Sequence, residues 1–306
     1  MKKKLLFILN PFAGQKKAKR LLGDLVNLFQ AHGYEVLVHL TQSPGDGSTA
    51  ARELGRDADL VVCSGGDGTL NEVVRGLLES GAETPLGYLP AGSTNDFAFS
   101  AGLSTDLLQA ARDVMEGVPT RIDAGSFNGR RFAYVAAVGA FTEVSYRTPQ
   151  AAKNLLGRLS FVMEGYRELQ DLRPIRLTVD CGDGDAIQGD FIFGAVSNVP
   201  PMSGLFPSSV ATNFSDGRFE VTLLRFPTTA AQWTQLIAAL RQGKDCPLIL
   251  RRQAGRVSIT SAESVCWSLD GEPAEAAQTF QIENLHQALS FVMPPRRDDD
   301  PRSSLL

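Results

Sequence analysis

Residues 60–72 read LVVCSGGDGTLNE, and this stretch decides the fold. Its four leading apolar residues predict a buried β-strand, its glycines predict a tight turn, and the apolar spacing that follows predicts a helix. Glycine lets the backbone approach a ligand closely, and the first turn of a helix offers free N–H groups to phosphate. Asp67 would repel a phosphate unless Mg²⁺ lay between them. The motif alone leaves two interpretations open: a phosphate cradle, or a plain strand–helix turn in which Asp67 only caps the helix.

Two further loops favour the phosphate cradle. NPFAG at residues 10–14 follows a predicted strand at 5–9, and PAGSTNDFA at residues 90–98 follows a predicted strand at 86–89. In an open parallel sheet, ligands bind beyond the carboxyl ends of the strands. Each loop could be an ordinary connection, but three at one sheet edge predict a nucleotide site.

The hydrophobic pattern predicts two domains. Up to residue 123, strand and helix signals alternate, which is typical of a parallel sheet with helices on both faces; the strands are expected at 5–9, 35–40, 60–63 and 86–89 and the helices at 16–32, 48–54, 70–78, 94–101 and 104–117. From 124 to 283 the pattern favours antiparallel strands, expected at 131–138, 175–179, 191–196, 219–224, 257–260, 265–269 and 279–282, with helices only near 150–170 and 229–242. Residues 284–295 could rejoin the first domain, and the charged tail 296–306 is expected to be disordered.

Composition narrows the class of protein. The chain has 306 residues, of which 43% are hydrophobic and 21% charged, as in an ordinary globular protein. A formal net charge of −4 argues against nucleic acid as a partner. The four cysteines form no CxxC pair, which fits a reduced cytoplasmic compartment. No apolar run approaches the length of a membrane-spanning helix, and the run near the start is too short for a signal peptide.

Together, the three motifs at 10–14, 65–69 and 92–98 resemble the signature set of the diacylglycerol kinase catalytic domain family, in particular its bacterial soluble lipid kinases. The resemblance covers residues 4–293. GGDGT is shared with sphingosine kinases, NAD kinases and phosphofructokinases, whereas GSTNDFA favours the lipid kinases. The resemblance implies a nucleotide-binding α/β domain of the NAD kinase and phosphofructokinase type, followed by a β-sandwich domain, with ATP and lipid meeting in the cleft between them.

The resemblance also implies which residues bind ATP and Mg²⁺. The ATP contacts fall on Asn10, Pro11, Phe12, Ala13, Gly14, Thr41, Gly65, Gly66, Asp67, Gly68, Thr69, Leu70, Asn71, Ser93, Thr94 and Asn95. Thr41 could equally be a simple strand-end threonine. The carboxylates of Asp67, Asp96 and Asp123 are expected to organise a hydrated Mg²⁺. Capping of a helix by Asp96 and a boundary turn at Asp123 are the plain alternatives, and they do not exclude that role.

The general base is expected in SLDGEP at residues 268–273. Asp-Gly between two strands is by itself a common hairpin turn. In the family, this position supplies the base, so Asp270 is expected to accept the proton of the lipid hydroxyl as that oxygen attacks the γ-phosphoryl group. A carboxylate suffices because phosphoryl transfer has a loose transition state. Glu272 is expected to orient Asp270 or to share Mg²⁺.

A second Asp-Gly turn, NFSDGRF at residues 213–219, precedes a strand. In related bacterial lipid kinases this segment holds a structural Mg²⁺ away from the ATP. Asp216 would supply a side-chain ligand there, with the carbonyls of Asn213 and Arg218 completing the site. Without the resemblance, the segment is a hairpin.

The sequence says less about which lipid is the substrate and which surface contacts the membrane. Residues 199–205 read VPPMSGL, with fewer glycines than the family often has, which leaves head-group preference open. Exposed anionic head groups could be met by Lys16, Lys17, Lys19 and Arg20, although a solvated helix face is the simpler interpretation. Leu205 and Phe206 could insert in a bilayer or belong to the core.

These observations predict an ATP- and Mg²⁺-dependent lipid kinase, with diacylglycerol as the leading substrate and phosphatidic acid as product. We expect a cytoplasmic protein that contacts the membrane peripherally and transiently, and a homodimer stays open. The alternatives are a kinase for phosphatidylglycerol, a sphingoid base or a soluble polyol, and a nucleotide-binding regulator without catalysis. The carboxylates Asp67, Asp96, Asp123 and Asp270 argue against the regulator. The Asn95-Asp96-Phe97-Ala98 context disfavours a NAD kinase.

Overall fold

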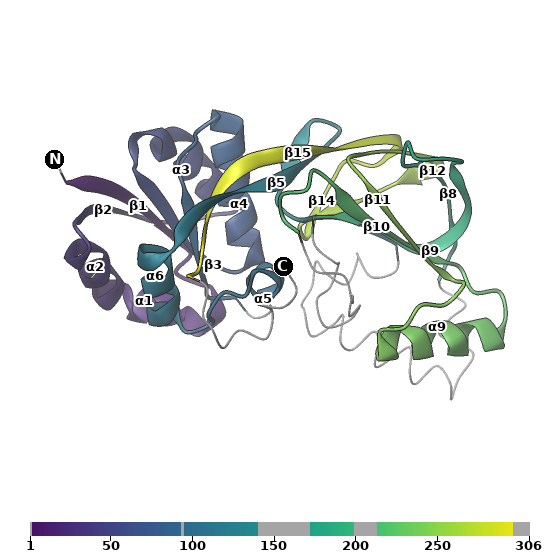
Figure 1. Cartoon of the computed structure of the whole chain (residues 1–306), viewed down its shortest axis with the longest axis horizontal. Helices are drawn as coiled ribbons and strands as arrows, with labels where there is room; N and C mark the ends of the chain where they lie inside the picture. The colour runs from purple at the N-terminus through teal and green to yellow at the C-terminus, as the bar shows by residue number, and fades with distance from the viewer. Residues whose placement is uncertain (1, 93–94, 140–171, 199–212, 296–306) are drawn as a thin grey trace. The chain divides into compact units, whose positions relative to one another are not determined.

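The computed structural model describes residues 2–92, 95–139, 172–198 and 213–295 (Figure 1). The chain divides into two compact units. Unit 1 comprises Met1–Ala124 and His286–Leu306, and unit 2 comprises Gly125–Leu285. No helix within the described ranges is both long and apolar enough to span a membrane.

Unit 1 is built on a parallel sheet. Its strands are β1 (Lys3–Leu9), β2 (Tyr34–Leu40), β3 (Leu60–Gly65) and β4 (Leu86–Pro90), in the order β4-β3-β1-β2. All six residues of β3 are buried, as expected for a parallel strand covered on both faces. The end of β15 (Ala277–Met293) adds a further parallel strand next to β4, with Phe291 opposite Leu86.

Helices cover both faces of this sheet (Figure 1). On one face, α2 (Leu22–Ala31) and α6 (Leu107–Glu116) share a core with alternate residues of β1. On the other face, α3 (Asp46–Leu54) and α4 (Asp67–Ser80) pack against each other. The shorter elements are the 3₁₀ turns Gly14–Lys16 and Gly55–Asp57 and the helices α1 (Lys17–Arg20) and α5 (Asp96–Ala101).

Unit 2 consists mainly of antiparallel strands. They are β5 (Val118–Phe127), which begins in unit 1, β6 (Arg130–Phe132), β7 (Val135–Gly139), β8 (Ile175–Asp180), β9 (Ile187–Ser197), β10 (Phe219–Arg225), β11 (Ile249–Ala254), β12 (Arg256–Val265), β13 (Ser268–Leu269), β14 (Glu272–Pro273) and the first part of β15. One core receives side chains from nearly all of them, including Phe191, Trp267 and Phe280. The helix α9 (Ala230–Gln242) buries Leu236 and Leu240 in a second core with residues of β9 and β10.

Several elements differ from the sequence-based expectation. The helix expected at 16–32 is interrupted at Leu21, whose φ of −93° and ψ of 5° leave the helical range. The strand expected at 131–138 is two strands, separated at residues 133 and 134. β12 is continuous to Val265, β15 is much longer than expected, and β5 and β11 were not expected. The helix expected near 150–170, the stretch 199–205 and the tail 296–306 lie outside the described residues.

Candidate functional site

The first two predicted loops of unit 1 are joined by a side-chain hydrogen bond. Asn10, directly after β1, donates through Nδ2 to the hydroxyl of Thr69 in α4 at 3.2 Å. Its Oδ1 accepts the backbone N–H of Phe12 at 3.0 Å. Asn10 therefore shapes its own loop and holds it against the GGDGT turn.

The GGDGT turn and the loop at residues 90–98 are linked by a buried tyrosine. Tyr88 of β4 donates its hydroxyl to the carbonyl of Gly65 at 3.1 Å, and its Oη lies 3.5 Å from Oδ1 of Asn95. A further link between the same two loops is the backbone N–H of Phe97, which donates to Oδ1 of Asp67 at 3.3 Å. Burial, followed by the negative charges of Asp67 and Cys63, raises the pKa of Tyr88 well above its usual value. The three loops thus form one hydrogen-bonded assembly at the carboxyl edge of the sheet.

Glycine is required where these loops approach each other. A Cβ on Gly92 would lie 2.5 Å from the Cα of Gly66, and a Cβ on Gly65 would lie 2.3 Å from the Thr69 hydroxyl. Gly14 has a φ of +45°, which other residues rarely adopt. Gly68 differs, because it is exposed and a Cβ there would meet nothing within 4 Å. The open space at Gly68 lies over the first turn of α4.

The amino end of α4 has the properties of an anion site. Its N-cap residue is Gly66, which makes no side-chain capping bond. By contrast, Asp106 caps α6 by accepting the N–H of Gln109 at 2.8 Å, and Glu72 accepts the N–H groups of Gly45 and Gly47 at the start of α3. The amino end of a helix is suited to phosphate, and the adjacent Asp67 carboxylate is suited to Mg²⁺.

The described part of the chain contains no group of three or more His, Cys, Asp or Glu residues close enough to hold a metal ion. Mg²⁺ commonly keeps several waters and uses one or two carboxylates together with substrate phosphates. The donor set at Asp67 fits such a partial site, in which most ligands come from water and the nucleotide.

The other residues predicted to contact the nucleotide differ in their burial and in their hydrogen bonds. Both amide atoms of Asn95 bond to the backbone of Gly92, with Oδ1 accepting its N–H at 2.8 Å and Nδ2 donating to its carbonyl at 3.0 Å. Leu70 is 1% exposed, and Thr41 is buried beyond the end of β2. The remaining predicted contacts divide as follows: Pro11 and Asn71 are buried, Ala13 is half-buried, Phe12 is 72% exposed, and Ser93 and Thr94 lie outside the described residues.

The other two residues predicted to organise Mg²⁺, Asp96 and Asp123, also belong to unit 1. Asp96 is the first residue of α5. Asp123 lies in β5 with its side chain 1% exposed, and its Oδ1 accepts the N–H of Gln287 at 2.7 Å and contacts Nδ1 of His286 at 3.1 Å. These contacts tie β5 to the returning strand β15.

Asp270 occupies the turn between β13 and β14 in unit 2. Leu269 pairs with Glu272, and positive φ angles at Asp270 (51°) and Gly271 (89°) fit a two-residue hairpin turn. The carboxylate does not face solvent. It accepts backbone N–H groups at 2.6 Å from Ala133, at 3.0 Å from Tyr134 and at 2.8 Å from Val135.

This environment changes the acidity of Asp270. Burial raises its pKa to about 6, the three backbone hydrogen bonds oppose that rise, and the charge of Glu272 adds to it. A carboxyl with a pKa near the working pH is suited to accept and release a proton. Asp270 thus combines fixed geometry with a raised pKa.

Glu272 is held by an arginine of β6. Its Oε2 lies 2.7 Å from Nη2 of Arg130, whose Nη1 donates to the carbonyl of Pro273 at 2.9 Å. The guanidinium therefore grips the far end of the turn that carries Asp270.

The turn predicted to hold a structural metal is exposed. Asp216 accepts the N–H of Arg218 at 2.9 Å, and Oδ1 of Asn213 accepts the N–H of Ser215 at 3.0 Å. Gly217 adopts a φ of +74°. These contacts define a turn before β10 in which Asn213 and Asp216 are exposed.

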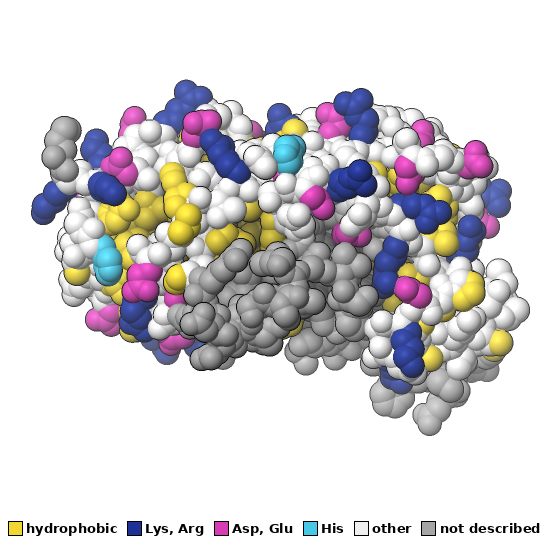
Figure 2. Space-filling view, in the orientation of Figure 1, with side chains coloured by type: hydrophobic (Ala, Val, Ile, Leu, Met, Phe, Trp, Pro, Cys, Tyr) yellow, Lys and Arg dark blue, Asp and Glu magenta, His cyan; other side chains and the backbone are white. Residues whose placement is uncertain are grey.

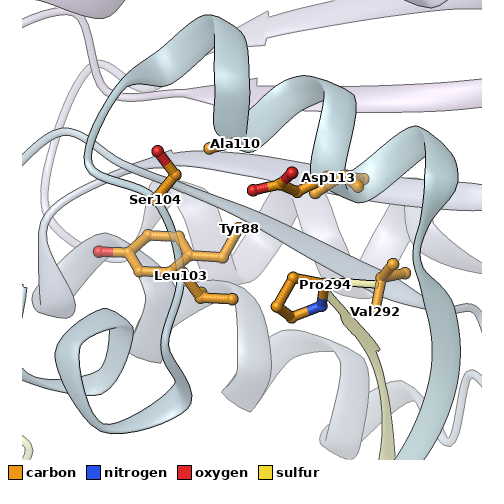
Figure 3. Close-up of a pocket in the computed structure, with 8 residues that line it drawn as sticks. Tyr88, Leu103, Ser104, Ala110, Asp113, Val292 and Pro294 are labelled. Carbon is orange, nitrogen blue, oxygen red and sulfur yellow. The ribbon is translucent and has the colours of Figure 1, made fainter. Parts of the chain in front are cut away.

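A small hollow in unit 1 is a separate feature (Figure 3). It has a volume of about 10 Å³ and is lined by Tyr88, Leu103, Ser104, Ala110, Asp113, Val114, Val292 and Pro294. Asp113 accepts a hydrogen bond from Nε2 of Gln109 at 2.8 Å. The volume is at the lower limit for one water molecule, so this hollow is not a nucleotide site.

The sequence did not point to Tyr88, Arg130 or Asn198. Tyr88 and Arg130 bond to predicted site residues, and Asn198 bonds to the carbonyls of Ala133 and Tyr134, whose N–H groups donate to Asp270. Tyr88 lies in an apolar strand and is typical of a core position. Arg130 is the first residue of the short strand β6 and lies far from residue 272 in sequence. Asn198 follows a buried strand, and a polar residue at a strand end is the one local signal it offers.

Comparisons with known proteins agree with the motifs. Residues 4–127 match the family described as the diacylglycerol kinase catalytic domain. The Bacillus subtilis (strain 168) protein named diacylglycerol kinase is 32% identical over 299 residues, which cover 96% of this chain and 98% of that protein. A protein of the same name from Staphylococcus saprophyticus is 30% identical over 278 residues, covering 89% of this chain and 90% of that protein.

Solved structures agree in fold. A crystal structure of a diacylglycerol kinase from Bacillus anthracis str. Sterne superposes with a TM-score of 0.74 at 22% identity, covering 96% of this chain and 98% of that one. An NAD kinase from Archaeoglobus fulgidus in complex with ATP gives a TM-score of 0.51 at 11% identity, covering 95% and 93%. These likenesses confirm the predicted parallel α/β architecture followed by antiparallel strands.

A diacylglycerol kinase is a phosphotransferase with an alcohol acceptor, and the prediction of this enzyme class is confirmed by the relatives. By the match of its motifs and by identity along nearly its whole length, the chain belongs to the diacylglycerol kinase catalytic domain family.

Proposed function

We propose that this enzyme is an ATP- and Mg²⁺-dependent kinase that phosphorylates the hydroxyl of diacylglycerol to give phosphatidic acid. The observation that carries the proposal is the hydrogen-bonded assembly of three loops at the amino end of α4, beside Asp67. The names of its relatives support diacylglycerol as the acceptor.

In this proposal, unit 1 binds the nucleotide. The first N–H groups of α4 bind phosphate oxygens, and Gly68 leaves the space that those oxygens need. Asp67, Asp96 and Asp123 would hold Mg²⁺ in part through water. When bound, Mg²⁺ neutralises charge on the phosphates as the γ-phosphoryl group is transferred.

Asp270 is the proton acceptor. The lipid oxygen forms a bond to the γ-phosphorus, the bond between that phosphorus and the bridging oxygen to the β-phosphate breaks, and the hydroxyl proton passes to the Asp270 carboxylate. The raised pKa of about 6 supports this role, because the carboxylate is ionised at neutral pH and takes up a proton readily. Glu272 and Arg130 hold the turn.

A transient contact with the membrane follows from the substrate, and unit 1 offers a candidate surface. Phe12 is 72% exposed, and Lys16, Lys17, Lys19 and Arg20 are all exposed on the segment after it. Lysine and arginine are attracted to anionic head groups. On the face shown in Figure 2, basic and acidic side chains are interspersed.

The test is transfer of radiolabelled γ-phosphate from ATP with Mg²⁺ into mixed micelles that contain diacylglycerol, phosphatidylglycerol or sphingosine. We expect label in diacylglycerol and only a small residual amount with Asp270→Asn. Label in only one of the other lipids would identify a kinase for that lipid instead. ATP binding without transfer to any lipid would favour a nucleotide-binding regulator.

A further inference from the structure

Asn198 is a buried residue that forms hydrogen bonds with the backbone segment beside Asp270. It directly follows β9 and is 5% exposed. Its Nδ2 donates to the carbonyl of Ala133 at 3.0 Å, and its backbone N–H donates to the carbonyl of Tyr134 at 2.9 Å. Both acceptors belong to the short stretch between β6 and β7.

The same peptide groups hold the Asp270 carboxylate with their opposite ends. The group that joins Ala133 to Tyr134 accepts from Asn198 through its carbonyl and donates to Oδ1 of Asp270 through its N–H at 3.0 Å. The next group accepts from the Asn198 backbone and donates to the same Oδ1 through the N–H of Val135 at 2.8 Å. In a trans peptide the carbonyl and the N–H point to opposite sides. Asn198 therefore donates hydrogen bonds to two peptide groups on the side that faces away from the Asp270 carboxylate.

This arrangement makes Asn198 important for the orientation of the donors. β6 ends at Phe132 and β7 begins at Val135, so residues 133 and 134 stand between two strands. Hydrogen bonds in series polarise each other and strengthen the chain. The side chain of Asn198 is itself oriented, because Nδ2 of Asn284 donates to its Oδ1 at 3.3 Å.

We propose that Asn198 is a positioning residue for Asp270, which it holds in place through the peptide groups of residues 133–135. It acts on the carboxylate that accepts the lipid proton and does not contact the reacting atoms. The inference rests on the proposed function, in which Asp270 is the proton acceptor.

Two variants test this role. Asn198→Asp keeps the volume and the backbone donor but replaces the Nδ2 donor by an oxygen facing the carbonyl of Ala133. Asn198→Ala removes the side chain contacts altogether. We expect each to lower kcat for diacylglycerol by about 10- to 100-fold, since small misplacement of a reacting group has effects of this size. The KM for ATP should stay within about twofold, because the nucleotide loops belong to unit 1.

Asn128→Ala is the matched control. Asn128 also bridges backbone groups of unit 2, donating through Nδ2 to the carbonyl of Thr279 at 3.3 Å and accepting the N–H of Gln281 at 2.8 Å. It has no hydrogen bond to the 133–135 stretch among those described. We expect it to lower the melting temperature about as much as Asn198→Ala and to leave kcat unchanged.

A double-mutant cycle gives the sharpest result. In the Asp270→Asn background, Asn198→Ala should cause no further loss of residual rate, because residues that act as one unit are not additive. Independent losses, or a folded Asn198→Ala enzyme with wild-type kcat, would overturn the role of Asn198. Wild-type enzyme and Asn128→Ala that are both inactive on every lipid would instead overturn the proposed function, and the positioning role with it.

Discussion

Arg130 and Glu272 form a 2.7 Å ion pair at one end of the turn that carries Asp270. The same guanidinium donates to the carbonyl of Pro273. The turn is thus held at two places, at Glu272 by a charged pair and at Asp270 by three backbone N–H groups.

We expect Arg130→Met to lower kcat about tenfold, because the planar guanidinium fixes the turn through two bonds. Both partners are about one-third exposed, with 35% and 36% of their side-chain surface accessible, so the loss of stability should stay below about 1 kcal/mol. Steady-state kinetics and thermal melts measure the two effects. Arg176→Met, which removes the more exposed pair with Asp190 in the same unit, is the control and should leave kcat unchanged. Equal kinetics for the two variants would contradict a role for Arg130.

The activity should depend on the ionisation of Asp270. Its pKa is raised to about 6, so kcat/KM should fall tenfold per pH unit below that value, with a constant plateau above it. A pH profile between 5 and 8, with the residual rate of Asp270→Asn as reference, measures this. A flat profile across pH 6 would exclude Asp270 as the titrating base.

The same pKa shift has an effect on stability with the opposite direction in pH. The native carboxyl has a pKa of about 6 and the ordinary value is 3.8, so the folded state binds the extra proton between these values. The stabilising contribution is complete below 3.8 and is lost as the pH rises through about 6. We expect the unfolding free energy of wild type, relative to Asp270→Asn, to fall across this window in urea titrations. Parallel pH dependences for the two proteins would refute the shift.

Gly68→Ala separates a ligand effect from a packing effect. A Cβ at Gly68 meets nothing within 4 Å, so we expect an unchanged melting temperature. If phosphate occupies that space, the added methyl group should weaken ATP binding about tenfold, a change visible by calorimetric titration. Gly23→Ala, equally open but on α2, is the control and should bind ATP as wild type does. Unchanged affinity in both variants would place the phosphates elsewhere.

Asp123 has a structural role that can be separated from its proposed role in metal binding. Asp123→Ala removes the acceptor of the Gln287 N–H and should cost about 1–3 kcal/mol of unfolding free energy. Asp123→Asn keeps an acceptor, so its cost should be smaller. If Asp123 also organises Mg²⁺, both variants should need more Mg²⁺ for half-maximal activity. A normal Mg²⁺ requirement would leave Asp123 with the structural role alone.

The exposed turn at Asp216 predicts a response to Mg²⁺ that does not involve ATP. We expect Mg²⁺ to raise the melting temperature of wild type and to have no such effect on Asp216→Ala. Asp183→Ala, which removes another exposed aspartate of unit 2, should respond as wild type does. The same Mg²⁺ response in all three proteins would contradict a metal at Asp216.

The strands of the parallel sheet of unit 1 were predictable because they are short apolar runs bounded by glycine or polar residues. β5 was missed because its first four residues are exposed and include Pro119, so no apolar pattern marks it. β15 was cut short because alternation fails in its middle, where Gln287 adopts a φ of 50° and the strand passes from one core to another. A local pattern cannot record a change of core.

The candidate site also combines a feature that the sequence indicates with contacts that it does not indicate. The Asp-Gly turn at residue 270 was evident from sequence, since its conformation depends on neighbouring residues. The three N–H donors that surround the carboxylate come from residues 135 to 137 positions earlier, and nothing in their side chains indicates that contact. The family resemblance predicted the role of Asp270, but only the fold reveals what holds it. The assignments of ATP and Mg²⁺ ligands stay predictions.

The path of β15 has a consequence for biosynthesis. Unit 1 is assembled from two separate segments, Met1–Ala124 and His286–Leu306, with the whole of unit 2 between them in sequence. As the ribosome releases the nascent chain, β4 waits with an unpaired edge until Phe291 has emerged. Such an edge is a template for wrong strand pairing. Synthesis therefore sets the order of maturation: the parallel sheet of unit 1 becomes complete only after the whole of unit 2 has been translated.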